Sequence, residues 1–128
     1  MKAKIVIGSP RGNSQGLGKD VVAAALKSAG FEVVDLGVNV SSSVFVDVAV
    51  KEKAEVIAVS ISIEETVPFL KRITDILQRR NLRDKIKIVI GGSAVSEKTR
   101  EEYGVDAYAK DAWDCVKKVK ALIVKQGE

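Results

Sequence analysis

The sequence has no histidine, one cysteine and two prolines among its 128 residues. Without histidine, neither a His-dependent catalytic triad nor a His metal site can form, and the usual general base at neutral pH is missing. Cys115 by itself cannot form an internal disulfide, and a tetrahedral zinc site cannot be built from one cysteine without histidine. These absences exclude several common classes of hydrolase and metalloprotein.

Long apolar runs and a large charge imbalance are absent as well. No segment approaches the ~18 apolar residues of a membrane span, and residues 1–4 lead into a short β-prone run, not into a signal peptide. We therefore expect a cytoplasmic protein without a membrane partner. The net charge is +4, and the most basic segment, 71–87, lacks interleaved aromatic residues. We interpret that segment as a solvated helix end and expect no nucleic-acid partner.

Five short β-prone runs alternate with five helical patterns along the chain. The β-prone runs lie at 4–8, 31–36, 56–60, 86–90 and 107–108, and the helical patterns at 18–29, 41–53, 68–80, 96–103 and 112–125. Strict βα alternation predicts a parallel sheet with helices on both faces. With right-handed crossovers, we expect a flavodoxin-like (Rossmann-like), doubly wound α/β fold with strand order 2-1-3-4-5, in one domain over residues 1–128.

Ligands of such sheets bind beyond the carboxyl ends of the strands, so the loops there are the candidate site. The first loop, 8–18, holds four glycines and two serines before a helix N-terminus. This composition favours contact with an anion or phosphate, although glycines that only allow the chain to turn would give the same pattern. The loop matches neither a Walker A motif nor a G-x-G-x-x-G fingerprint.

The loops after the third and fourth strands each allow two interpretations. Glu64 and Glu65 form either a carboxylate pair for acid–base chemistry or acidic residues ahead of a helix start, and we favour the helix start. Gly91-Gly92 indicates either a tight turn or a ligand lying close to the backbone.

The residues near the C-terminus have a structural interpretation. Trp113 begins the expected apolar face of the last helix. We expect Tyr108 to pack in the core or at its rim, and Cys115 to be a buried, unreactive thiol.

Three short motifs carry a resemblance to a known family. Residues 13–18 stand where that family has D-x-H-x-x-G, residues 60–62 stand at its S-x-L, and residues 91–92 match its G-G. In their order and spacing, these motifs resemble the cobalamin-binding domain family of methionine synthase, corrinoid methyl-carrier proteins and carbon-skeleton mutases. The resemblance covers nearly the whole chain and includes residues 29–38 and 104–108.

The resemblance implies a cobalamin-carrying module with a methyltransferase or mutase partner subunit. It implies no catalytic residue in the chain, and with no nucleophile–base pair visible we expect a cofactor-carrying subunit more than an autonomous enzyme. The residues that would contact the cofactor lie at the three motifs: Gly12, Asn13, Ser14, Gln15, Gly16, Gly18, Ser60, Ser62, Gly91 and Gly92.

The departures from the family pattern concern the metal. Gln15 stands where the family has the histidine that ligates cobalt from below, and Asn13 stands where it has the supporting aspartate. Ser62 replaces the family's leucine. We therefore expect cobalamin binding without a protein ligand to the metal, so that no residue is assigned as a metal ligand.

Two alternatives remain open. Residues 8–11, Gly-Ser-Pro-Arg, resemble the phosphate loop of flavodoxin-like flavin reductases, so flavin mononucleotide or another phosphate-bearing ligand is one alternative. The other is a degenerate domain that binds no cofactor and serves as an interaction subunit.

Overall fold

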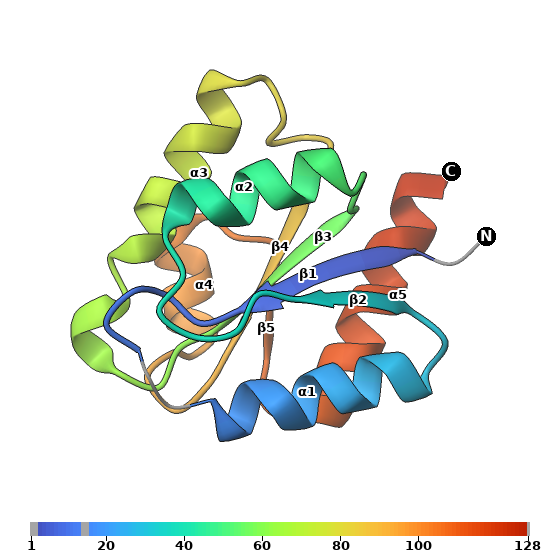
Figure 1. Ribbon diagram of the computed structural model, residues 1–128, viewed down its shortest axis with the longest axis horizontal. Coiled ribbons are helices and arrows are strands. Elements are labelled where there is room, and N and C mark those ends of the chain that lie inside the picture. Colours follow the sequence, from blue (N-terminus) through green and yellow to red (C-terminus); the bar gives the residue numbers. More distant parts are fainter. Residues whose placement is uncertain (1–2, 14–15, 128) are drawn as a thin grey trace.

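The computed structural model describes residues 3–13 and 16–127, and its elements alternate as the sequence predicts (Figure 1). The strands are β1 (Lys4–Gly8), β2 (Glu32–Asp35), β3 (Val56–Ser60), β4 (Lys87–Gly91) and β5 (Ala107–Ala109). The helices are α1 (Leu17–Ser28), α2 (Ser42–Lys51), α3 (Phe69–Arg79), α4 (Glu97–Tyr103) and α5 (Ala112–Gly127). The strands form one parallel sheet in the order β2-β1-β3-β4-β5, which confirms the predicted topology.

The sheet separates two hydrophobic layers, one under α2, α3 and α4 and one under α1 and α5 (Figure 1). In β3, Ile57 and Val59 point into the first layer, whereas Val56 and Ala58 point into the second. Both faces are covered, which explains why β3 reads as a nearly continuous apolar run rather than an alternating one. An edge-to-face contact between Phe45 and Phe69, with ring centroids 5.5 Å apart, joins α2 to α3 in the first layer.

The predicted helix starts at Ser41 and Ser96 are confirmed. The hydroxyl of Ser41 accepts a hydrogen bond from the Val44 amide at 3.4 Å, and Ser96 forms a capping box with Thr99. Gly104 ends α4 with φ +66°, a left-handed conformation that glycine adopts without strain.

The expectation for Trp113 was wrong. Its side chain is 77% exposed, and the buried face of α5 begins at Cys115 and continues through Val116 and Val119. Trp113 lies in the first turn of α5, beside the carboxyl edge of the sheet, where no hydrophobic layer lies against it. Its apolar character alone therefore did not decide its burial.

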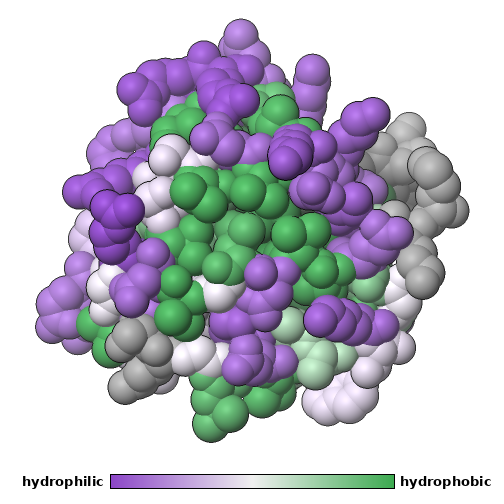
Figure 2. All heavy atoms as spheres, in the orientation of Figure 1, coloured by the Kyte–Doolittle hydropathy of each residue, from purple (hydrophilic) through white to green (hydrophobic). Residues whose placement is uncertain are grey.

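The basic segment 71–87 is paired with acidic residues on the surface. Arg80 donates to Asp47 at 2.9 Å and Arg83 to Asp106 at 2.9 Å. Figure 2 shows the molecule in the orientation of Figure 1. On the face toward the viewer, apolar side chains gather over α2 and polar side chains surround them. In the described part of the chain, no helix is both long and apolar enough to span a membrane.

A buried lysine ties α1 to the edge of the sheet. Lys19 Nζ donates to Asp35 of β2 at 2.7 Å and to Asp20 at 2.6 Å. Burial opposes the charge on Lys19, but the hydrogen bonds to the two carboxylates outweigh it and raise the lysine pKa. Burial likewise opposes ionisation of Asp35, and the hydrogen bonds from Lys19 and the Gly37 amide lower the pKa of that carboxyl. The pair fixes the first turn of α1 against β2.

We predict that the Asp35→Asn variant loses about 1–2 kcal/mol of unfolding free energy at pH 7, since a charge-assisted hydrogen bond to a buried lysine is weakened. The folded-state pKa of Asp35 is lowered, so its contribution is complete above the usual aspartate pKa and disappears as pH falls through the folded-state value. Urea unfolding from pH 7 down to pH 3 measures this loss.

The matched control is Asp75→Asn, which breaks the exposed i,i+4 pair with Lys71 and is expected to cost under ~0.5 kcal/mol. A difference between wild type and Asp35→Asn that stays constant down to pH 3 would contradict the prediction.

Candidate functional site

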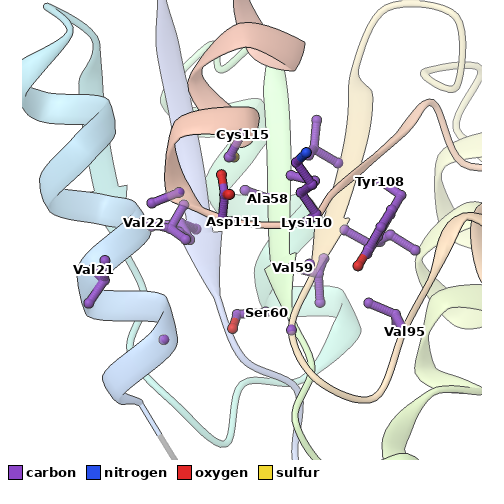
Figure 3. A pocket seen from close by; sticks show the side chains of 18 of the residues that line it. Val21, Val22, Ala58, Val59, Ser60, Val95, Tyr108, Lys110, Asp111 and Cys115 are labelled. Carbon is purple, nitrogen blue, oxygen red and sulfur yellow. The ribbon is translucent and has the colours of Figure 1, made fainter.

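A cavity of about 530 Å³ opens at the carboxyl edge of the sheet, between the sheet and the first turns of α1 and α5. Its walls come from α1, from the ends of β1, β3 and β4, and from the junction between β5 and α5. Figure 3 shows Val21 and Val22 of α1 at one side, Tyr108 and Val95 at the other, and Ser60 and Cys115 between them. The volume lies within the roughly 300–1,000 Å³ range of small-molecule sites.

The strand register explains why space remains here. Ser60 of β3 pairs with Gly91 of β4, and Gly91 pairs with Ala109 of β5, so the outermost row on this face has almost no side-chain volume. Opposite this row lies Gly18 of α1, where a Cβ atom would stand 3.9 Å from the Ser60 hydroxyl. Small residues on both sides leave the cavity between helix and sheet, and we call it the slot.

One row further in, larger side chains close the slot. Ile7, Ala58 and Val89 are in register on β1, β3 and β4, and Cys115 of α5 packs against the same hydrophobic layer. All four line the slot and are at most 4% exposed. This row and Cys115 form the floor of the slot.

Four of the ten residues predicted to contact a cofactor line the slot: Gly18, Ser60, Gly91 and Gly92. Four others, Gly12, Asn13, Gly16 and Ser62, do not line it. The remaining two, Ser14 and Gln15, lie outside the described residues.

Asn13 and Ser62 shape the loops around the slot. Asn13 is fully buried, and its side-chain carbonyl accepts hydrogen bonds from the Ser62 amide at 2.8 Å, the Ile63 amide at 3.0 Å and the Ser62 hydroxyl at 3.2 Å. One side chain thereby fixes the loop after β1 to the loop after β3. The role of Asn13 in the described structure is to position these loops.

In the first part of the loop after β1, residues 9–13, the backbone amides bond within the protein. The amides of Ser9 and Arg11 donate to the carbonyls of Gly37 and Val40 at 3.0 and 2.9 Å. The Gly12 amide donates to the Asn39 side chain at 2.9 Å and the Asn13 amide to the Pro10 carbonyl at 2.9 Å. All four amides between residues 9 and 13 are committed to the protein, so none of them is directed at a phosphate.

The sequence left two interpretations of Gly91-Gly92, a tight turn or a backbone that a ligand can approach. The first describes Gly92, and the open space beside Gly91 is compatible with the second. Gly92 has φ +114°, and a Cβ atom on it would collide with the backbone of Ile61, so the turn itself requires glycine. Gly91 has ordinary φ and lines the slot, where a Cβ atom would stand 3.1 Å from the Ala109 carbonyl.

The acidic pair does not belong to the slot. Glu64 and Glu65 begin a 3-10 turn at Glu64–Thr66 and are exposed, in agreement with the preferred helix-start interpretation. In the described ranges no group of three His, Cys, Asp or Glu side chains could hold a metal ion.

Sequence reasoning missed the wall that β5 and α5 contribute. Tyr108, Lys110, Asp111 and Ala112 line the slot there, and Asp111 also caps α5 by accepting from the Asp114 amide at 2.8 Å. The available signal was their position directly after the fifth strand. Cys115 is buried as expected, and burial raises the pKa of its thiol to about 12, so it stays protonated near neutral pH.

Comparison with known proteins identifies matches over nearly the whole chain. The B12 binding domain family matches residues 3–116. Trimethylamine corrinoid protein 1 of Methanosarcina acetivorans is 37% identical over 120 residues, which cover 94% of this chain and 56% of that protein. This chain therefore spans little more than half the length of that relative.

Solved structures agree with this match. The monomethylamine corrinoid protein of Methanosarcina barkeri superimposes with a TM-score of 0.87 at 33% identity, over 95% of this chain and 57% of that one. A chain of the methanol:cobalamin methyltransferase complex from the same organism gives a TM-score of 0.88 at 26% identity, over 94% and 46%.

We predict that Asn13→Leu destabilises the protein by about 2–4 kcal/mol, because the partly buried amides of Ser62 and Ile63 lose their acceptor. Urea unfolding measures the loss. Asn13→Asp is the matched control: a carboxylate that accepts amide hydrogen bonds stays ionised, so this variant should remain within about 1 kcal/mol of wild type. Equal destabilisation by both changes would show that the acceptor is unimportant.

Proposed function

The chain belongs to the B12-binding domain family, and from that membership we propose that it is a methyl-carrier module that binds a corrinoid with its nucleotide tail in the slot. The observation that carries the proposal is the slot itself, an open cavity at the carboxyl edge of the sheet between α1 and α5. When bound, the corrinoid supplies the cobalt that takes up and releases a methyl group. The chain binds and orients this cofactor.

The residues that line the slot fit the parts of a nucleotide tail. A flat base fits against the floor, where Ile7, Ala58 and Val89 offer apolar contact. The Ser60 hydroxyl and the exposed Lys110 stand nearer the mouth, and the charge of Lys110 is complementary to the phosphodiester of the tail. Because Gly18 and Gly91 have no side chains, the slot between α1 and the sheet is wide enough for the base.

The lower face of the cobalt receives no imidazole from this chain, since the sequence has no histidine. A tail base held against Ile7, Ala58 and Val89 would be kept from the metal. The proposal is therefore a base-off corrinoid without a protein nitrogen ligand, in which affinity comes from the tail contacts and not from a bond to cobalt.

A methyltransferase subunit is the proposed partner. The chain's structural neighbours include a methanol:cobalamin methyltransferase complex. Leu17 and Val21 of α1 and Trp113 of α5 are 79%, 53% and 77% exposed around the carboxyl edge that holds the slot. A partner that covers the corrinoid would also cover this apolar rim. A cytoplasmic location, as expected from the sequence, is part of the proposal.

The two alternatives have less support. A flavin phosphate would need free amides in the loop after β1, and those between residues 9 and 13 are engaged. A degenerate domain without a ligand does not account for the cavity that the small residues Ser60, Gly91, Ala109 and Gly18 leave open.

We predict that the purified protein retains hydroxocobalamin during gel filtration and that the complex shows a base-off absorption spectrum. No change of the kind caused by histidine ligation should appear, since no imidazole is available. Colourless protein after incubation with excess cofactor would contradict the proposed function, and a base-on spectrum would place the tail outside the slot.

We further predict that Gly18→Leu abolishes cobalamin retention, because the new side chain fills the gap between α1 and Ser60. The unfolding free energy should stay the same or rise, since glycine in a helix costs roughly 0.5–1 kcal/mol relative to alanine. Ala24→Leu, on an exposed position of the same helix that does not line the slot, is the control and should bind normally. Full retention by Gly18→Leu would show that the slot is not used.

A further inference from the structure

The floor of the slot offers no strong hydrogen-bonding group to a ligand. The side chains of Ile7, Ala58 and Val89 contain only carbon and hydrogen, and the backbones of β1, β3 and β4 are each paired with a strand on both sides. Cys115 supplies only a thiol, and burial keeps that thiol protonated by raising its pKa to about 12. A thiol is a weak donor and a weak acceptor.

The polar residues that line the slot are not part of the floor row. Ser60 belongs to the outer row, and Lys110 and Asp111 are exposed at the mouth. Asp111 is already engaged as the cap of α5. Tyr108 stands between Ala107 and Ala109, which point to the α1 and α5 face, and it packs against the opposite layer. Tyr108 therefore lines the side of the slot and is not one of the floor residues.

We propose that this floor selects corrinoids by the chemistry of their lower base, favouring a benzimidazole over a purine. The proposal rests on the proposed function, because it assumes that the tail enters the slot. A benzimidazole presents a carbon-only edge to the floor. An adenine presents an exocyclic amine and ring nitrogens, which would lose water there and find no partner. A floor without strong hydrogen-bonding groups thus disfavours the polar ring by leaving its hydrogen bonds unmade.

The test compares two cofactors that differ only in the base. Dissociation constants of the wild-type protein for cobalamin and for its adenine-containing analogue are measured by calorimetry or fluorescence quenching of Trp113. We expect the adenine analogue to bind at least about tenfold more weakly, as for one unpaired buried polar group. Equal affinities would overturn the selectivity while leaving the proposed function intact. Failure of both cofactors to bind would overturn both.

Variants of the floor residues test whether the apolar floor causes the preference for cobalamin over its adenine analogue. Val89→Thr and Cys115→Ser each place a hydroxyl on the floor with little change of shape, and each should reduce the preference for cobalamin by at least about threefold. Val56→Thr is the matched control, since Val56 is buried in the same layer but does not line the slot. It should lower stability without changing the ratio of the two dissociation constants.

The ratio is measured on one preparation of each variant, so a loss of folded protein changes both constants together and leaves the ratio unaffected. An unchanged ratio in both floor variants, or an equal change in Val56→Thr, would overturn the proposed role of the floor.

Discussion

The slot depends on one packing constraint, the lack of side-chain volume where α1 and α5 cross the carboxyl edge of the sheet. A helix over a sheet normally leaves a gap that large side chains fill. Here the outer row is Ser60, Gly91 and Ala109, and Gly18 faces it from α1. Below that row, Ile7, Ala58 and Val89 restore normal packing. The missing volume is therefore confined to the end of the sheet where a ligand can enter.

The loops around this gap are held by bonds that do not depend on a ligand. The loop after β1 is bonded through its backbone to the loop after β2, and Asn13 connects it to the loop after β3. The ion pair between Lys19 and Asp35 fixes the start of α1. A preformed cavity needs little ordering when a ligand binds, so more of the contact energy appears as affinity.

In the proposed function, the chain binds a corrinoid without a bond to the metal. The chain has no histidine, so tail contacts in the slot are the source of affinity that the structure offers. Apolar contact is general, whereas the choice among lower bases depends on which polar atoms of the ligand are left without partners. Under these proposals, affinity and selectivity come from the same few floor residues.

The sequence by itself determined the order of the elements, the strand order and four of the slot residues, because alternating patterns and glycines at strand ends are local signals. It did not determine which of the two glycines at 91–92 serves the turn, why Asn13 is buried, or that Trp113 is exposed. Asn13 acts through hydrogen bonds to residues 49 and 50 positions away, and the row Ser60, Gly91 and Ala109 exists only through the register of three strands. Such contacts join residues that are distant in the chain, so only the tertiary structure decided where side-chain volume is missing and which groups surround it.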